Sequence, residues 1–353
     1  MPITNIRPSH YNLIVERIDE GRCVPFLGAG VNVSSQNYQG LPLAYEVALH
    51  LVRGLTKKFT KEQLEDLANK ADEDVKRRVA QLVSHLDDEQ IRQLPWSDVE
   101  QYLVQADPLP ALLRASLPDL ARIALHVEVE QDFQFLMKLV HEVLPDEQHQ
   151  PSPLLQMLAS LPFKLFVTTN YDRLLERAFP NNDYELLIQP VGGFSDLEQL
   201  AIQERLAEIE KPIIYKIHGS FRDSGGRAGL SGDINRLILT EEDYIQFLSV
   251  VGRKDMGVPT MVRDKLADGT ILFLGYSLQD WDFRTIHKIL FEPFDPRQKS
   301  KSFAIQKDPP DFWVQYWNSK NVTILNVDLS TFATELKDYW EDFIAKKGGQ
   351  NGS

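Results

Sequence analysis

The chain has 353 residues, of which 43% are hydrophobic and 25% are charged. This length and composition are typical of a globular protein with one large α/β domain that carries an insertion, or with two modest domains. Nonspecific nucleic-acid binding needs clustered positive charge, and the net charge of -13 argues against it. We therefore expect no direct nucleic-acid partner.

The single cysteine, Cys23, excludes an intrachain disulfide and a four-cysteine zinc site. We expect no zinc and no other resident metal. We also expect no transmembrane helix, and residues 1–5 lack the basic start and the apolar stretch of a secretory signal. These features together predict a cytoplasmic protein that does not associate with membranes.

The first predicted elements lead into a glycine turn. Residues 9–20 carry apolar side chains at helical spacing, which predicts a short amphipathic helix. Residues 23–27 are apolar and predict a buried strand, and Gly28-Ala29-Gly30 forms the turn after it. A further helix is expected to begin near Pro42.

The character of the chain then changes, from about residue 56 to residue 150. Charged residues are dense, strand-like runs are scarce, and apolar residues recur at helical spacing. We interpret this segment as a helical insertion or subdomain.

Strand-like runs resume after the insertion and alternate with helical patterns. Strands are predicted at residues 163–168, 184–188, 213–217, 271–274, 303–305 and 322–327, and helices at residues 171–178, 198–209, 241–251 and 281–290. This alternation predicts an α/β fold with a Rossmann-like, doubly wound parallel sheet. Residues 1–345 then form one domain with the helical insertion, and residues 346–353 a flexible tail or linker.

Polar or glycine-rich motifs follow four of the predicted strands. They are Gly28-Ala29-Gly30, Thr169-Asn170-Tyr171-Asp172, Lys216-Ile217-His218-Gly219 and Gly275-Tyr276-Ser277. Because the carboxyl ends of parallel strands meet at one edge of the sheet, where ligands bind, we expect the motifs to share one site. The segment 222–235, with four glycines, is either a mobile cover of that site or a plain surface loop.

The glycine turn has two readings. A turn without side chains lets the backbone approach a pyrophosphate, and the next helix start offers free N–H donors, but the same sequence also makes a plain tight turn. Val33 stands where the third glycine of the dehydrogenase fingerprint would fall. That substitution disfavours a hydride-transferring Rossmann enzyme.

Each polar residue at the other strand ends can likewise have either a structural role or a role in ligand binding. Asn170 and Asp172 can cap a helix or bind a ribose and a water, and Ser277 can cap a helix or bind a phosphate. His218 is either structural or a proton acceptor for a ribose hydroxyl or a water. Asn326, at a further strand end, can meet an adenosine.

The order of these motifs resembles the sirtuin (silent information regulator two) family, and most of all the NAD-hydrolysing effector domains of bacterial antiphage defence systems. By this resemblance Asn170 and His218 form the catalytic pair, and Asp172 orders the pocket around them. The resemblance places the phosphates and nearby ribose along Gly28, Ala29, Gly30 and Ser34, and the adenosine half against Gly275, Ser277 and Asn326.

Two departures from protein-deacylating sirtuins argue against an acyl-lysine substrate. One cysteine cannot build their four-cysteine zinc module, and Gly40-Leu41-Pro42 is not followed by their Asp-Phe-Arg. The resemblance therefore implies an NAD hydrolase that yields nicotinamide and ADP-ribose, with NAD as its substrate. A protein deacylase and a noncatalytic NAD or ADP-ribose sensor are the alternatives.

The resemblance also implies control, since an NAD hydrolase that is always active would be toxic. A defence effector of this kind would deplete cellular NAD only on a signal. Control is expected through a homo-oligomer, a partner ATPase, an argonaute-type protein or a fused sensor domain.

Overall fold

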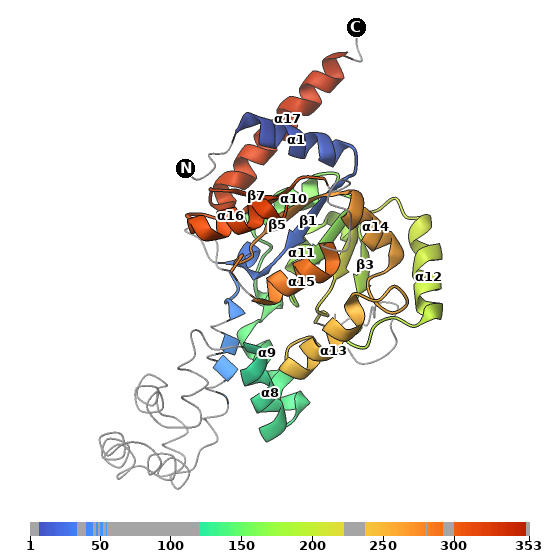
Figure 1. Cartoon of the computed structure of the whole chain (residues 1–353), viewed down its shortest axis with the longest axis vertical. Helices are drawn as coiled ribbons and strands as arrows, with labels where there is room; N and C mark the ends of the chain where they lie inside the picture. Colours follow the sequence, from blue (N-terminus) through green and yellow to red (C-terminus); the bar gives the residue numbers. More distant parts are fainter. Residues whose placement is uncertain are drawn as a thin grey trace, which may run out of the picture. The chain divides into compact units, whose positions relative to one another are not determined.

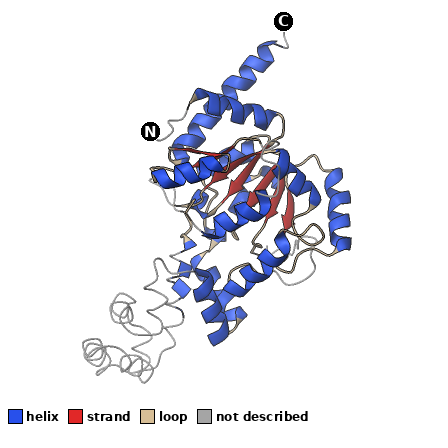
Figure 2. Ribbon diagram, viewed as in Figure 1, coloured by secondary structure: helices blue, strands red, loops and turns tan. Residues whose placement is uncertain are grey.

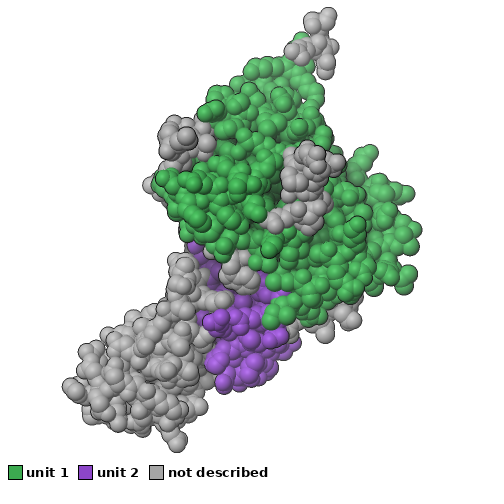
Figure 3. Space-filling model, in the orientation of Figure 1, with its two compact units in different colours: residues 1–41, 146–238, 245–353 green, residues 42–145, 239–244 purple. Residues whose placement is uncertain are grey.

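The computed structural model describes residues 7–33, 40–44, 47, 48, 50, 51, 54, 120–221, 237–279, 281–291 and 300–350. The chain forms two compact units, which Figure 3 shows in different colours. The first unit comprises residues 1–41, 146–238 and 245–353, and the second comprises residues 42–145 and 239–244. The first unit contains the sheet and is called the sheet unit below; the second is called the helical unit.

The sheet has seven parallel strands in the order β3-β4-β2-β1-β5-β6-β7 (Figure 2). The strands are β1 (Cys23–Leu27), β2 (Leu165–Thr168), β3 (Glu185–Ile188), β4 (Ile213–Lys216), β5 (Thr270–Leu274), β6 (Ser302–Ile305) and β7 (Val322–Leu325). This topology confirms the predicted α/β, Rossmann-like fold, and each predicted strand is present with ends that differ by at most a few residues.

Nearly continuous apolar sequence explains why these segments form a parallel sheet. Every residue of β1 and of β5 is buried, as expected for strands covered on both faces by helices. Phe26 of β1 packs on Phe273 of β5 with ring centroids 5.6 Å apart. Lys216, which ends β4, is the exception to this apolar pattern, since it is charged and fully buried.

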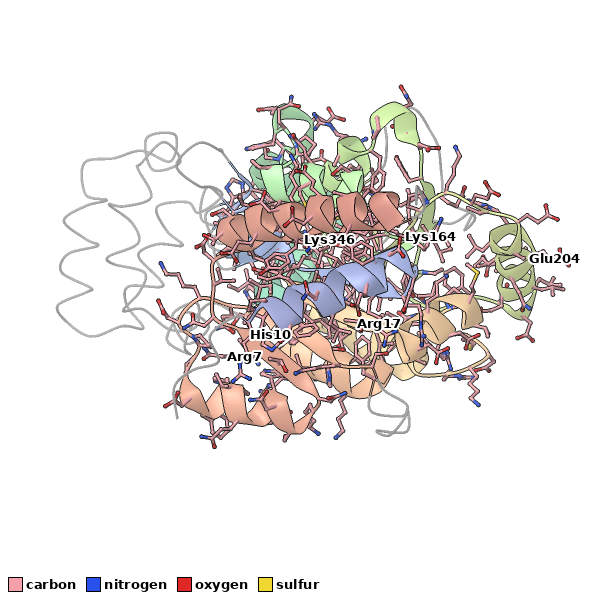
Figure 4. All side chains as sticks on the ribbon, turned by 90° about the horizontal axis from the view of Figure 1, so that it is seen from above. Arg7, His10, Arg17, Lys164, Glu204 and Lys346 are labelled. Carbon is pink, nitrogen blue, oxygen red and sulfur yellow. The ribbon has the colours of Figure 1, made fainter. Side chains whose placement is uncertain are left out.

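Helices cover both faces of the sheet. In the sheet unit they are α1 (Pro8–Asp19), α10 (Pro153–Ser160), α11 (Leu174–Ala178), α12 (Asp196–Ala207), α14 (Thr260–Asp268), α15 (Trp281–Phe291), α16 (Asp311–Ser319) and α17 (Leu329–Gln350). The short 3-10 turns are η1 (Ala29–Asn32), η2 (Asp146–Gln148) and η3 (Pro180–Asn182). Figures 1 and 4 show α10 and α11 on one face and α14 and α15 on the other.

The first and last helices of the sheet unit, α1 and α17, pack side by side (Figure 4). Tyr11 stacks on Tyr339, with centroids 4.7 Å apart. Lys347 Nζ lies 2.6 Å from both carboxylate oxygens of Asp19. The helix α17 therefore continues to Gln350, into the segment 346–353 that composition alone indicates as a flexible tail or linker.

Helices also make up the described part of the helical unit. Residues 44, 47, 48, 50, 51 and 54 are helical, which agrees with the helix expected near Pro42. They are followed by α8 (Leu120–Glu130) and α9 (Phe133–Val143). The helix α13 (Glu241–Val251) begins in this unit. The two helices α8 and α9 agree with the predicted helical insertion, of which residues 56–119 lie outside the described residues.

No helix in the described ranges is both long and apolar enough to cross a membrane.

Candidate functional site

The central strand β1 marks the point where the strand order reverses. The chain builds β2, β3 and β4 on one side of β1 and then crosses to β5 on the other side. In open parallel sheets, the crevice outside the carboxyl ends of the strands at such a switch point is where ligands bind. The turn after β1 and the turn after β5 flank this point, and the segments after β2 and β4 lie next to it on the same edge.

The two glycine turns pack directly against each other. Gly30 N donates to the carbonyl of Gly275 at 2.9 Å. Gly275 has a φ of +75°, and a Cβ there would lie 2.5 Å from the backbone nitrogen of Val31. A Cβ on Gly28 would lie 2.8 Å from the Gly275 carbonyl oxygen. The contact between the turns therefore suffices to require these glycines, before any ligand is considered.

Tyr276 ties three strand ends together. Its hydroxyl donates to the carbonyl of Leu27 at 2.9 Å and lies 2.9 Å from Thr169 Oγ1. The ring stacks on Phe283 of α15 with centroids 4.6 Å apart. The carboxyl ends of β5, β1 and β2 are thus held in one arrangement by a single side chain.

Asn170 lies in the segment between β2 and α11 and is anchored to the glycine turn. Its Nδ2 donates to the carbonyl of Gly28 at 3.2 Å, and its backbone nitrogen donates to Thr168 Oγ1 at 3.1 Å. The side chain is half-buried. The amide oxygen can accept a hydrogen bond from a water or a ribose hydroxyl, and Nδ2 has a second N–H to donate.

Asp172 holds the start of α11 and reaches back to the glycine turn. Its Oδ1 accepts from the backbone nitrogen of Leu174, the first residue of α11, at 3.0 Å, and its Oδ2 accepts from Asn32 Nδ2 at 3.0 Å. Burial raises the pKa of this carboxyl to about 6, against the opposing effect of the Lys216 ammonium. The side chain therefore organises the segment between β2 and α11 and is mainly ionised at neutral pH.

Lys216 is fully buried at the end of β4, where it faces the segment between β2 and α11. Its Nζ lies 2.8 Å from Glu176 Oε1 and donates to the carbonyl of Tyr171 at 3.3 Å. It also donates to the carbonyl of Asp172. The neighbouring strands are in register here, with Thr168 of β2 opposite Lys216.

His218 follows Lys216 by two residues and is 3% exposed. Its ring packs edge-on against Phe247 of α13, with centroids 5.3 Å apart. Burial lowers the pKa of the imidazole to about 3, so the ring is neutral at physiological pH. The backbone of the strand end is fixed to its neighbour, because Ile217 N donates to the Thr168 carbonyl at 2.9 Å.

The remaining predicted site residues are spread along the same edge. Ala29 and Ser277 are exposed, so both are accessible to a ligand. Asn326 follows β7, which lies three strands from β1, or roughly 14 Å. Its Oδ1 accepts from Asp308 N at 2.7 Å, so it also has a structural role. Ser34 and the segment 222–235 lie outside the described residues.

Three residues around this site were not assigned a role from the sequence: Asn32, Glu176 and Lys216. Each is buried and polar. A lysine inside the apolar run of residues 213–217 was the available signal, since a charge in a buried strand needs a partner. Glu176 stands four residues after Asp172 among leucines, which is the same kind of signal.

The described part of the chain contains no cluster of three or more His, Cys, Asp or Glu side chains that could hold a metal ion. The cysteine Cys23 is buried in β1, and burial raises the pKa of its thiol well above the usual value. It is a core residue of the sheet and lies at the opposite end of β1 from the glycine turn.

Comparison with known proteins shows what part of the chain resembles. Residues 164–325 match the model of a SIR2-like domain, and this segment includes Asn170, His218 and Gly275. The NAD(+) hydrolase ThsA of Bacillus cereus (strain MSX-D12) is 22% identical over 173 residues, or 48% of this chain and 32% of that protein. The chain thus matches about a third of the length of this curated relative. Residues 164–325 are thus similar to a SIR2-like domain, which bears out the sirtuin-like resemblance of the motifs.

Proposed function

We propose that the protein is an NAD hydrolase that cleaves the bond between nicotinamide and ribose and releases nicotinamide and ADP-ribose. The observation that carries the proposal is that Asn170 is anchored by its amide nitrogen at the switch point of a SIR2-like sheet. His218 stands at the end of the strand next to it. The similarity to an NAD(+) hydrolase supports the same chemistry.

The reaction needs little acid catalysis. Nicotinamide leaves from a cationic pyridinium as a neutral ring, whereas an ordinary glycoside must have its leaving oxygen protonated. The site has to stabilise an oxocarbenium-like ribose and supply a nucleophile. We assign to the amide oxygen of Asn170 the positioning of the attacking water and a ribose hydroxyl.

We assign to His218 the role of the base. A pKa of about 3 makes the ring a weak base that is always available in its neutral form above that pH. A weak base is sufficient here, because water that adds to an oxocarbenium ion becomes a strong acid and readily transfers its proton. The glycine turns 28–30 and 275–277 would then lie along the phosphates and the adenosine half of NAD, with Ser34 and Asn326 further along the same dinucleotide.

The test is chromatography of the products after incubation of the purified protein with NAD, over a range of protein concentrations. The wild-type protein should release nicotinamide and ADP-ribose in equal amounts. Asn170→Ala and His218→Ala should each reduce the rate by about 100-fold or more, as expected for groups that act on the reacting atoms. The exposed Asn318 and His141 supply matched controls, and their alanine variants should retain the wild-type rate. Undiminished release by both site variants would refute the assignment.

Two other functions make different predictions for the same assay. A protein deacylase would consume NAD only in the presence of an acyl-lysine peptide. A noncatalytic sensor of NAD or ADP-ribose would bind nucleotide in calorimetry and release no nicotinamide at any protein concentration. The lack of a four-cysteine module in the sequence disfavours the first alternative.

We further propose that the activity belongs to a regulated antiphage defence effector in the cytoplasm that depletes cellular NAD. The support is the resemblance of the motifs to such effector domains, together with the toxicity that constant NAD hydrolysis would have. Control would come from assembly into a homo-oligomer, or from a partner ATPase, an argonaute-type protein or a fused sensor domain. A steep rise of specific activity with protein concentration would support assembly, and a constant specific activity would exclude it as the trigger.

A further inference from the structure

We propose that Lys216 is a positioning residue for the NAD site, and that its buried ammonium group fixes the segment carrying Asn170 against the strand end carrying His218. The inference rests on the proposed function, because it assigns a role in the same site. Lys216 is fully buried, so its ammonium group acts through its protein partners.

The ammonium group of Lys216 links the two proposed catalytic residues, since it is close in sequence to one and bonded to the segment that carries the other. Lys216 is two residues before His218, and its Nζ donates to the carbonyls of Tyr171 and Asp172, which follow Asn170 directly. The third hydrogen-bond partner of Nζ is Glu176 Oε1, at 2.8 Å. An ammonium group has three N–H donors, so this set uses the full capacity of the side chain.

Packing alone does not explain a lysine at this position. The residues around it on β4 are apolar, Lys216 is 0% exposed, and its partner Glu176 is 4% exposed. Glu176 Oε2 is buried and has no hydrogen-bond partner among the described residues. A buried ion pair that leaves one oxygen unsatisfied is often no better for stability than two apolar side chains of similar volume.

The Lys216 ammonium group donates hydrogen bonds to two backbone carbonyls, which an apolar side chain cannot do. These carbonyls belong to the segment whose conformation sets the direction of the Asn170 side chain. Without the link, the register of β2 and β4 and the bond from Leu174 N to Asp172 would still hold the ends of the segment. Its middle would keep the bonds of Tyr171 to Phe221 N and to the Ile238 carbonyl, but would lose its contacts with β4 through Lys216 and be less restrained. A displacement of about 1 Å in a catalytic group can reduce a rate about 100-fold.

The test compares three variants of the full chain. Lys216→Met leaves the Glu176 carboxylate buried without its partner, so this variant can fail by unfolding. The double variant Lys216→Met/Glu176→Leu removes both charges and avoids that problem. Lys211→Met is the matched control, since Lys211 precedes the same strand and makes an exposed ion pair with Asp183.

We expect the double variant to fold and to show a kcat reduced about 100-fold with a KM close to the wild-type value. An unfolded fraction would also lower the apparent kcat without changing KM, so kcat is calculated per folded protein, with the folded fraction measured by circular dichroism. Lys211→Met should match the wild type in both parameters. A folded double variant with wild-type kcat would overturn the proposal.

Hydrogen–deuterium exchange gives a second readout that does not depend on catalysis. In the double variant, peptides covering residues 169–175 should exchange faster, while peptides from β1 and β7 should be unchanged. If the wild-type protein releases no nicotinamide, the proposed function fails, and exchange alone then decides whether Lys216 holds this segment. Unchanged exchange at residues 169–175 would overturn the positioning role in either case.

Discussion

The buried state of His218 predicts that this one side chain makes the fold sensitive to acid. The pKa of the imidazole is lowered from 6.5 to about 3 by burial. The unfolded chain takes up a proton below pH 6.5 and the folded chain does not, so the unfolded state binds more protons between these two values. The free energy of unfolding therefore falls by about 1.4 kcal/mol for each pH unit below 6.5, and by about 5 kcal/mol in total by pH 3.

The perturbation that isolates this effect is His218→Gln, which removes the titrating ring and keeps a polar side chain. Asp172 contributes a slope of the opposite sign, because a pKa raised from 3.8 to about 6 makes the folded state bind more protons in that range. The contribution of Asp172 to stability therefore falls as the pH rises through that range. Both proteins contain Asp172, so the difference between their stabilities reports His218 alone.

The assay is urea unfolding followed by tryptophan fluorescence, at several pH values between about 7.5 and 5. Relative to His218→Gln, the wild-type protein should lose about 2 kcal/mol between pH 6.5 and pH 5 and nothing between pH 7.5 and pH 7. Tyr171→Phe, at a neighbouring residue that does not titrate in this range, is the matched control and should follow the wild-type pH dependence. A difference between wild type and His218→Gln that stays constant over the whole range would refute the burial of a neutral imidazole.

Two further substitutions test the packing around the site. Gly275→Ala should lower the free energy of unfolding by about 2 kcal/mol or more, because the residue has a φ of +75° and its Cβ would lie 2.5 Å from Val31 N. The control Gly348→Ala, where a Cβ meets nothing within 4 Å, should not lower it. Equal stabilities of Gly275→Ala and the wild type would contradict the packing of the glycine turns. Asp146→Ala should lower the free energy of unfolding by about 1–3 kcal/mol, because the buried carboxylate accepts from the backbone nitrogen of Arg173 at 2.8 Å and from its Nε at 3.1 Å. An unchanged melting temperature would show that these two donors find other partners.

The fold could be predicted from the sequence because its signal is local. Each strand of the sheet is a short apolar run bounded by turn residues, and the helices between them have their own periodicity. The sequence defined the ends of the elements less well than their presence. The helix predicted at residues 171–178 begins only at Leu174, because Asp172 bonds the Leu174 nitrogen through its side chain and is not itself helical.

The site could be predicted only in part, because its organisation depends on contacts between distant segments. The sequence placed Asn170 and His218 at strand ends on one edge of the sheet, whereas the pairing of their strands, β2 and β4, is seen only in the structure. It could not show that Gly275 is required by Val31, or that Lys216 bonds two carbonyls near Asn170, since these pairs are far apart along the chain. It also could not show that His218 is buried, because burial depends on Phe247 from a later helix.

The chain passes between its two units at four junctions, and three of these are bonded to the candidate site. At the first, residues 41 and 42, Leu41 N donates to the Asn32 carbonyl at 2.8 Å, and the side chain of Asn32 donates to Asp172 at 3.0 Å. At the second, residues 145 and 146, the side chain of Asp146 accepts from Arg173 N at 2.8 Å. Both junctions are thus bonded to the segment that follows Asn170.

The third junction, residues 238 and 239, reaches both proposed catalytic segments. Ile238 N donates to the backbone carbonyl of His218 at 3.0 Å, and the Ile238 carbonyl accepts from the Tyr171 hydroxyl at 2.6 Å. The fourth junction, residues 244 and 245, lies within the helix α13. The segments that carry Asn170 and His218 are thus bonded to residues at three of the four junctions between the units.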